Sequence, residues 1–509
     1  MSVEHFDVII VGAGLSGVGA ARHLQDHCPG KTYAILEGRA AMGGTWDLFR
    51  YPGVRSDSDM HTLGYHFKPW IDEKAIAEGP AILSYIEETA KENNITPHIR
   101  YQHLVEAANW CSADSRWTLT VTGRENGAGQ RFSCNFLLMC AGYYSYRQGF
   151  SPPFPGRGRF KGKILHPQEW PPDLDYRGKK IVVIGSGATA VTLVPVLAAS
   201  AGHVTMLQRS PTYMISMPWR DRIANLLRKL LPAAWAYRIT RWKNVHLQQY
   251  LYRRTRTDPE GIKKVLLDRV RKQMGPDYDV DRHFTPSYNP WDQRLCLVPE
   301  NDFFIAVKEG RAELVTDHID CFTETGILLR SGRELAAEII VTATGLNLVQ
   351  MGEMDLRVDN RAVDFSKTWT YKGLMVSGVP NLVSTFGYVN ASWTLRSDII
   401  AQWACRLINH LDASGLRQVM PVISAGEAAA MKQRPWVDGF SSGYMQRAMH
   451  AFPRQGDREP WLNTQDYGRD KKMLLNDALE DGALQFTNPP AQPAASAASP
   501  PLSTNRSAA

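Results

Sequence analysis

Asp7-Val8-Ile9-Ile10-Val11-Gly12-Ala13-Gly14-Leu15-Ser16-Gly17 is the stretch that decides the fold of this chain. An apolar run enters a glycine-rich turn, and a segment rich in small and apolar residues follows. The first glycine permits a tight turn, the second lets a pyrophosphate approach the backbone, and the third lets a helix pack close to the strand. The start of that helix offers free N–H groups and a positive dipole end to phosphates. We therefore predict a dinucleotide-binding strand–turn–helix unit, with Gly12, Gly14, Ser16 and Gly17 at the cofactor.

A second copy of the pattern reads Ile181-Val182-Val183-Ile184-Gly185-Ser186-Gly187-Ala188-Thr189-Ala190. Its predicted cofactor-binding residues are Gly185, Ser186, Gly187, Ala188, Thr189 and Ala190. Both copies follow an apolar strand and open an apolar helix, which is the context that the motif requires. Two dinucleotide sites in one chain indicate electron transfer between two cofactors, as in flavoproteins. The fold class that we predict is α/β, with two Rossmann-like domains and a helical insertion.

The residues that end the next strand distinguish the two cofactors. The run Tyr33-Ala34-Ile35-Leu36 ends in Glu37, where an acid hydrogen-bonds a ribose diol. The run from Val204 ends in Arg209-Ser210, and a guanidinium suits a 2′-phosphate because it binds phosphate in bidentate fashion. We therefore predict FAD in the first unit and NADPH in the second. The alternatives are that Glu37 is a solvated strand end and Arg209 a surface base.

A longer signature lies between the two units, from Phe160 to Pro171, and matches F-x-G-x-x-x-H-x-x-x-W-P. A second pattern combines Gly43-Gly44-Thr45-Trp46 with the segment from Tyr51 to Asp57. On these residues the chain resembles the type I Baeyer–Villiger monooxygenases. It is most similar to the branch that includes the bacterial FAD-containing monooxygenase that activates thioamide prodrugs such as ethionamide. The resemblance runs from Asp7 to about Phe486.

The resemblance implies an FAD- and NADPH-dependent monooxygenase that uses O2 to convert a ketone into an ester or lactone through a C4a-peroxyflavin. Oxidation of sulfur compounds is implied as a side activity. Arg294 stands at the position of the catalytic arginine, and Asp57 at that of the carboxylate that orients it. A fixed cation would keep the peroxide anionic and stabilise the oxyanion of the adduct. The alternative is that Asp57 and Arg294 form an ordinary salt bridge between domains.

Further residue roles are implied by the resemblance alone. Arg55 and Ser56 match positions near the nicotinamide end. His166 matches a hydrogen-bonded hinge residue that couples domain rotation to catalysis, rather than an acid, a base or a metal ligand. Cofactor-binding positions carried over for the flavin are Gly44, Thr45, Trp46, Asp47, Leu48, Asp57 and Val105. The motif and hinge residues are Phe160, Gly162, His166, Trp170 and Pro171.

Two positions depart from the family pattern. Many relatives have a lysine where Gln293 stands, so we expect Arg209 to provide most of the preference for NADPH. Some relatives have a flavin-stacking tyrosine where Leu63 stands, so that contact is not expected here. The segment from Gly387 to Trp393 is expected near the flavin and the substrate pocket.

Composition excludes several other classes of protein. The net charge of +7 in 509 residues suits anionic dinucleotides but is too weak to indicate nucleic-acid binding. Seven scattered cysteines without a C-x-x-C pair argue against a disulfide framework, a metal site and a dithiol centre, and they suit the cytoplasm. The residues before the first strand do not resemble a secretory signal, so we expect none. The apolar segment Ile181–Ala199 is long enough to span a membrane, but its glycine turn favours a strand and a helix.

The motifs divide the chain into four parts. We predict a discontinuous FAD-binding domain (1–148 and 346–486), an NADPH-binding domain (149–217 and 290–345), a helical insertion (218–289) and a disordered tail (487–509). The tail is rich in proline, alanine and serine. Arg116–Thr122 alternates like a strand, and the polar segment 124–130 is typical of a hairpin turn.

Residues 219–256 are basic and amphipathic, with ten lysines and arginines and one acid, Asp221. We favour a helical insertion that packs on the NADPH domain and covers the substrate route. A helix of this kind can also lie on an anionic membrane surface, so peripheral membrane contact is the alternative.

Two other functions are left open by the sequence. One is a flavin monooxygenase that oxidises nitrogen or sulfur centres in amines, thioethers or thioamides without Baeyer–Villiger activity. The other is a dithiol-linked reductase or a flavin-bearing redox sensor, which the missing C-x-x-C disfavours.

Overall fold

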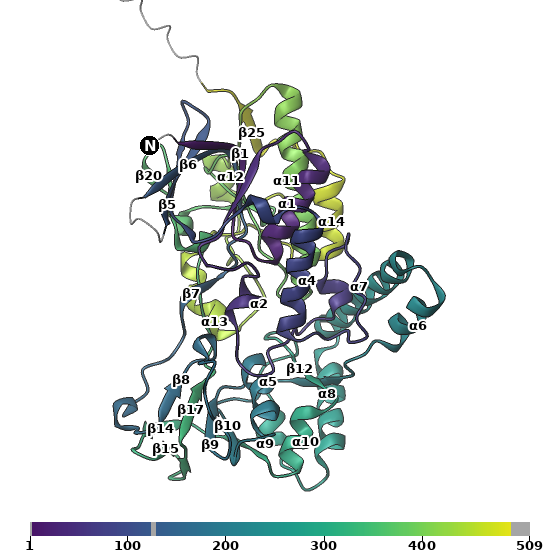
Figure 1. The fold of residues 1–509 in the computed structure, drawn as a ribbon, viewed down its shortest axis with the longest axis vertical. Helices are drawn as coiled ribbons and strands as arrows, with labels where there is room; N and C mark the ends of the chain where they lie inside the picture. The colour runs from purple at the N-terminus through teal and green to yellow at the C-terminus, as the bar shows by residue number, and fades with distance from the viewer. Residues whose placement is uncertain (1–2, 124–128, 490–509) are drawn as a thin grey trace, which may run out of the picture.

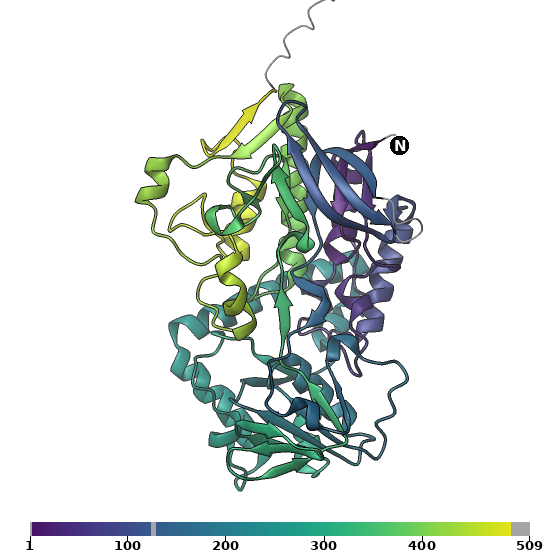
Figure 2. The ribbon, with the colours of Figure 1, turned by 90° about the vertical axis from the view of Figure 1, so that its left-hand side faces the viewer.

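The structure, a computed structural model, describes residues 3–123 and 129–489. Figures 1 and 2 show two α/β regions, one above the other along the long axis of the molecule. The upper region begins with the N-terminal strands and also holds most of the C-terminal half. The lower region is built from the middle of the chain.

The first fingerprint forms the predicted strand–turn–helix unit. Strand β1 (Glu4–Val11) leads into α1 (Leu15–His27), and the chain returns as β2 (Tyr33–Leu36), which pairs parallel with β1. Gly12 has a φ of +101°, and a Cβ there would lie 2.7 Å from the carbonyl oxygen of Cys140. Only glycine therefore fits this turn.

The upper sheet has nine strands and mixes sequence-distant segments. Its order is β20-β19-β4-β5-β6-β1-β2-β3, and β23 pairs with the end of β6. The strands not yet defined are β3 (Ile99–Arg100), β4 (His103–Cys111), β5 (Arg116–Gly123), β6 (Gln130–Met139), β19 (Asp355–Val358), β20 (Arg361–Ala362) and β23 (Leu382–Ser384). The predicted strand at Arg116–Thr122 is confirmed as part of β5. Most of the predicted hairpin turn, 124–128, lies outside the described residues.

The helices of the upper region come from both the N-terminal and the C-terminal parts of the chain. Helix α1 packs against α11 (Trp393–Ser414), and α14 (Tyr467–Leu475) packs on α11 in turn. Smaller elements of the same region are α2 (Thr45–Leu48), α3 (Met60–Leu63), α4 (Gly79–Glu92), α12 (Ala425–Ala430), α13 (Gly443–Ala448), β21 (Thr370–Tyr371), β22 (Met375–Val376), β24 (Gln418–Pro421) and β25 (Leu484–Thr487). Thr487 closes β25, so the predicted tail does not begin at that residue, and 490–509 lie outside the described residues.

The second fingerprint builds a five-stranded parallel sheet in the order β13-β10-β9-β17-β8. These strands are β8 (Lys163–Leu165), β9 (Lys180–Ile184), β10 (His203–Gln208), β13 (Ala312–Thr316) and β17 (Ile339–Thr342). The apolar segment Ile181–Ala199 forms β9 and α5 (Ala188–Leu197), as its glycine turn predicts. No helix in the described part of the chain is both long and apolar enough to cross a membrane.

The lower region carries several additions to its sheet. They are β11 (Met214–Met217), α6 (Arg222–Leu230), α7 (Ala233–Thr257), α8 (Pro259–Met274), α9 (Val280–Phe284), β12 (Cys296–Pro299), α10 (Asp302–Lys308), β14 (Ile319–Phe322), β15 (Gly326–Leu329) and β16 (Glu334–Ala336).

Two antiparallel strands connect the upper and lower regions. They are β7 (Tyr144–Gly149) and β18 (Leu346–Leu348), which pair with each other. The boundaries predicted at 148/149 and 345/346 fall at these strands, and the division into domains remains our proposal.

Candidate functional site

A cavity of about 1210 Å³ lies between the two α/β regions. It exceeds the roughly 300–1,000 Å³ of an ordinary small-molecule pocket, so it has room for more than one bound group. Residues at the carboxyl ends of three parallel strands from each region line it. They are Val11, Leu36 and Cys140 above, and Ile184, Leu207 and Ala343 below. Ligands of doubly wound sheets bind at this edge.

The space around Gly14 and Gly187 shows whether a dinucleotide could fit this cavity. Each is the residue before a helix, α1 or α5, and each has an ordinary φ of −79° that any residue can adopt. A Cβ on Gly187 would meet no atom within 4 Å, and a Cβ on Gly14 would have only ordinary contacts with Gly44. The protein itself therefore does not require glycine here. Both residues line the cavity, so a missing side chain leaves space for a group such as a pyrophosphate.

Glu37 is held firmly at the end of β2. Its Oε2 accepts a hydrogen bond from Ala13 N at 2.8 Å, and its Oε1 accepts one from Arg39 N at 2.9 Å. Burial raises the pKa of Glu37, and the two N–H donors oppose that rise. Each carboxylate oxygen keeps a lone pair for a further donor, so Glu37 can bind a ribose diol.

Arg209 and Ser210 line the cavity from the lower region, just after β10. The Arg209 side chain is exposed, and no carboxylate of the described residues lies within ion-pair distance of it. A cation that is not neutralised by the protein is suited to a phosphate. Asp317 and His318 lie beside it because β10 and β13 run parallel. The sequence did not lead us to expect Asp317 and His318 in the lining of this cavity.

Arg294 and Asp57 face the same cavity, but the structure does not join them directly. No hydrogen bond or ion pair within 4 Å links the two side chains, and Arg294 Nε has no hydrogen-bond partner among the described residues. Asp57 is exposed to the cavity, but desolvation by the cavity walls raises its pKa, while Arg294 and Arg55 oppose the rise, so the charges still interact. Burial by itself would lower the pKa of Arg294, but Tyr444, Tyr143, Tyr144 and Asp57 together raise it. Arg294 is therefore a permanent cation in the cavity.

Arg55 and Ser56 also line the cavity, and both are buried. Arg55 forms an ion pair with Asp302 at 2.9 Å, and its guanidinium lies 5.5 Å from the ring centre of Trp219. Its second terminal nitrogen has no partner among the described residues. The pair with Asp302 spans the two regions and has no signal in the sequence.

The predicted flavin-contact positions divide into two groups. Gly44, Thr45, Trp46 and Val105 line the cavity, whereas Asp47 and Leu48 do not. Asp47 instead forms ion pairs with Arg39, at 2.7 Å, and with Arg50. Gly17 and Ala190 likewise pack behind the turns, while the remaining fingerprint residues line the cavity. The predicted cofactor contacts of Asp47, Leu48, Gly17 and Ala190 are therefore not tested by the cavity lining and stay a prediction.

His166 contacts both strands that connect the two regions. Its Nε2 donates to the carbonyl oxygen of Gly345 at 3.0 Å, just before β18, and its Nδ1 accepts from Gln168 N at 3.1 Å. A Cβ on Gly149, at the end of β7, would lie 2.0 Å from the imidazole. Gln168 Nε2 donates to Ser145 O at 2.8 Å. Burial lowers the pKa of His166, consistent with a neutral ring that donates at one nitrogen and accepts at the other.

The other signature residues fix the segment that carries His166. Phe160 and Trp170 are buried in two different cores of the lower region. A Cβ on Gly162 would lie 2.3 Å from the carbonyl oxygen of Glu338 and 2.6 Å from the Phe160 ring. Pro171 follows Trp170 and is half-buried. The packing of these residues therefore holds the segment that carries His166 against the lower region, while the imidazole contacts the connecting strands.

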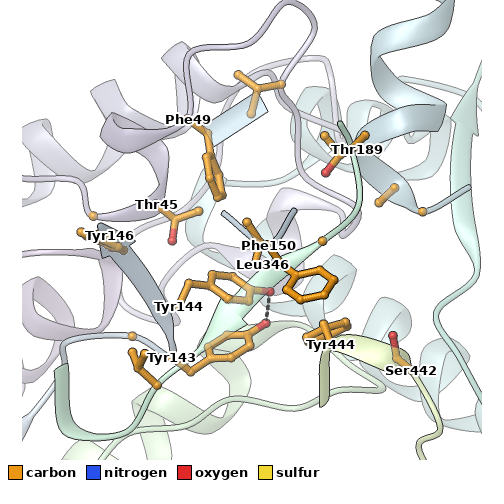
Figure 3. Close-up of a pocket in the computed structure, with 18 of the residues that line it drawn as sticks. Thr45, Phe49, Tyr143, Tyr144, Tyr146, Phe150, Thr189, Leu346, Ser442 and Tyr444 are labelled. Atoms are coloured by element: carbon orange, nitrogen blue, oxygen red, sulfur yellow. Dashed lines mark hydrogen bonds between the residues drawn. The ribbon is translucent and has the colours of Figure 1, made fainter. Parts of the chain in front are cut away.

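Three tyrosines that were not expected from the sequence line the cavity together with Arg294. Figure 3 shows Tyr143 and Tyr144 joined by a hydrogen bond between their hydroxyls, with the ring of Tyr444 nearby. The ring of Trp393 stacks on that of Tyr143 with 5.0 Å between the ring centres, and its Nε1 donates a hydrogen bond to Ser16 Oγ at 2.8 Å. Tyr143 and Tyr144 directly follow the small-residue turn Cys140-Ala141-Gly142 after β6, which could have indicated them. Tyr444 comes from α13, for which the sequence offers no signal.

Three residues of the segment 387–393, which was expected near the substrate pocket, line the cavity: Tyr388, Ala391 and Trp393. Leu63 lines it too, and the absence of a flavin-stacking contact at this position stays a prediction. The buried cysteines of the described residues are Cys28, Cys134, Cys140, Cys296 and Cys405, and each is free.

Two Rossmann-like units that open into one cavity define an oxidoreductase that uses two dinucleotides. Comparisons with known proteins agree. The family described as flavin-binding monooxygenase-like matches residues 67–254, and a NAD(P)-binding Rossmann-like domain matches 10–71. The FAD-containing monooxygenase EthA of Mycobacterium tuberculosis is 51% identical over 96% of this chain and 99% of its own length. MymA of the same species is 48% identical over 95% of this chain and 98% of its own.

The chain therefore belongs to the FAD-containing monooxygenases. Solved structures support the fold. A steroid monooxygenase bound to NADP covers 95% of this chain and 100% of its own, with a TM-score of 0.77 and 23% identity. A cyclohexanone monooxygenase covers 84% of this chain and 91% of its own, with a TM-score of 0.69 and 19% identity.

Proposed function

We propose that this monooxygenase performs Baeyer–Villiger oxidation, inserting one oxygen atom of O2 next to a ketone carbonyl to give an ester or lactone. The observation that carries the proposal is the permanent cation of Arg294, which lines the shared cavity without a direct carboxylate partner among the described residues. When bound, FAD supplies the activated oxygen and NADPH the hydride.

The reaction needs such a cation because negative charge develops on both reacting oxygens. The attacking oxygen must remain an anion, and the ketone oxygen gains charge during attack. A preorganised guanidinium stabilises both in a site from which water is largely excluded. Asp57 acts as a positioning residue, since it lies within electrostatic range of Arg294 but does not neutralise it by direct contact.

His166 is proposed as a positioning residue for motion between the two regions. Its hydrogen bond to Gly345 and its contact with Gly149 lie at both connecting strands, so rotation of one region must be transmitted past this ring. In the same view, Gly44, Thr45, Trp46 and Val105 hold the flavin, Glu37 its ribose, and Arg209 with Ser210 the 2′-phosphate.

The second candidate is oxidation of sulfur or nitrogen centres, such as those of thioethers, thioamides or amines. It is favoured by the hydroxyls beside Arg294. Burial raises the pKa of Tyr144 and of Tyr444, so both stay protonated and can donate hydrogen bonds to the oxidant. An oxidant that keeps its own proton is electrophilic and suits these substrates, and it would also account for sulfoxidation as a side activity.

Replacing Arg294 tests the choice between the two reactions. For Arg294→Ala we expect ester formation from a 2-ketone to fall about 10²-fold or more, because a charge-stabilising donor is lost. Oxidation of a thioether should fall much less, and FAD binding should persist. Arg294→Lys is the matched control, since it keeps a charge but not the guanidinium shape, and it should retain part of the ketone activity. Unchanged ester formation by Arg294→Ala would refute the assignment.

A further inference from the structure

An arm formed by α6 and α7, residues 222–257, extends from the lower region beside the upper one (Figure 1). One side of this arm is tightly attached to the body of the protein. Arg241 donates hydrogen bonds to the carbonyl oxygens of His61, Thr62 and Gly64, and Asn244 donates to Asp59 at 2.9 Å. The arm is therefore rigidly held against α3, whose last residue, Leu63, lines the cavity.

Each helix of the arm also exposes a stripe of large apolar residues. On α6 they are Ile223, Leu226 and Leu230, spaced three and four residues apart, which places them on one face. On α7 they are Trp235, Ile239 and Trp242, with the same spacing. The exposed fractions of Leu230, Trp235 and Trp242 are 70%, 59% and 64%. Single exposed apolar residues are ordinary, but two such stripes on one arm indicate a binding surface.

The charges of the arm have one sign. Residues 222–257 contain nine lysines and arginines and no aspartate or glutamate. Several of these cations are paired with acids elsewhere, such as Arg256 with Asp292 at 2.7 Å. Arg222, Lys229 and Arg238 are exposed beside the apolar stripes, and none has a carboxylate of the described residues within ion-pair distance.

We propose that this exposed face of the α6–α7 arm docks on an anionic lipid bilayer. Apolar side chains, with tryptophan among them, would enter the interfacial layer, and Arg222, Lys229 and Arg238 would contact lipid phosphates. A second copy of the chain is a poorer occupant. A symmetric dimer through this face would bring two basic surfaces together without an acid on either. The docking does not depend on which reaction the enzyme performs.

Flotation of the full-length holoenzyme with lipid vesicles tests the proposal. We expect binding to vesicles that contain phosphatidylglycerol, weak binding to vesicles of phosphatidylcholine alone, and release by high salt. The double variant Trp235→Ser/Trp242→Ser should bind at least about tenfold more weakly. The triple variant Arg222→Glu/Lys229→Glu/Arg238→Glu should bind about 100-fold more weakly or worse, since each basic residue strengthens binding about fivefold.

The controls carry substitutions of the same type, apolar to serine and basic to glutamate, elsewhere on the exposed surface. They are Val3→Ser/Ile305→Ser and Arg159→Glu/Arg330→Glu/Arg361→Glu, and both should bind like the unaltered protein. NADPH oxidation by every variant checks that it is folded. Absence of flotation by the unaltered protein would overturn the proposal, as would equal losses in the controls. Sedimentation showing a dimer that Trp235→Ser/Trp242→Ser dissociates, without vesicle binding, would assign the face to a second copy instead.

Discussion

Gly187→Ala should weaken the binding of the nicotinamide cofactor while leaving the folded protein intact. In the structure a Cβ at Gly187 meets nothing within 4 Å, and its φ of −79° suits alanine. Alanine lowers the entropy of the unfolded chain, which stabilises by about 0.4–1 kcal/mol. As the residue before α5 it is a poorer cap than glycine, which costs a similar amount, about 0.5–1 kcal/mol. The free energy of unfolding should therefore change by less than about 1 kcal/mol.

The substitution should cost more in the free energy of cofactor binding than in the free energy of unfolding. A methyl group in the space before α5 would keep a pyrophosphate from the N–H groups of the helix end. Loss of one charge-assisted hydrogen bond costs about 1.5–3 kcal/mol, so the KM for NADPH should rise roughly 10- to 150-fold. The KM for NADH should rise equally, because the pyrophosphate is common to both. Steady-state kinetics with both cofactors and thermal unfolding of the apoprotein measure these quantities.

Gly185→Ala is the contrasting control. Its φ is +139°, and a Cβ would lie 2.3 Å from the carbonyl oxygen of Ala343. It should lower the stability by about 1–3 kcal/mol, in contrast to Gly187→Ala. If Gly187→Ala left both KM values unchanged, or destabilised the protein as much as Gly185→Ala, the inferred position of the pyrophosphate would be refuted.

Three further predictions follow from the cavity. Arg209→Ala should raise the KM for NADPH at least about tenfold more than that for NADH, because one phosphate contact contributes about 1.5–3 kcal/mol, and equal effects would exclude a 2′-phosphate contact. Glu37→Gln should weaken FAD binding, measured by flavin fluorescence, since a neutral amide binds the ribose diol and the Ala13 and Arg39 N–H groups less strongly; unchanged affinity would contradict the role. Burial lowers the pKa of His166 below its usual 6.5, so the unfolded chain takes up a proton there that the folded chain does not. The stability that the neutral ring contributes is thus fully present above about pH 6.5 and is lost as the pH falls below that value. His166→Gln should therefore flatten the decline in Tm between about pH 7 and about pH 5.5. An unaltered slope would argue against a buried neutral ring.

The sequence predicted the parts of the fold that local patterns encode. Both strand–turn–helix units lie where the glycine spacing put them, because Gly12 and Gly185 adopt backbone conformations that other residues rarely accept. Strand β5 alternates in burial as its sequence alternates in polarity. The joining of β19 and β23 to the upper sheet could not be read in detail, since their partners β4 and β6 lie more than two hundred residues away.

The same distinction holds in the site. Glu37 and Arg209 were predictable because each ends a strand at a fixed interval from a fingerprint. The pair of Arg55 with Asp302 joins residues 247 positions apart and depends on how the two regions pack. Tyr444 reaches Arg294 only because α13 packs against β18. The resemblance indicated that Asp57 and Arg294 belong together, but it did not show that they lack direct contact in this structure.

Product analysis with isotopically labelled O2 tests the central claim most directly. Purified protein would receive FAD, NADPH, labelled O2 and an aliphatic 2-ketone, and the products would be examined by mass spectrometry. The proposed function predicts an ester that carries one labelled oxygen atom. Oxidation of NADPH that yields only peroxide from ketones, together with labelled sulfoxide from a thioether, would contradict Baeyer–Villiger activity and favour oxidation of sulfur centres.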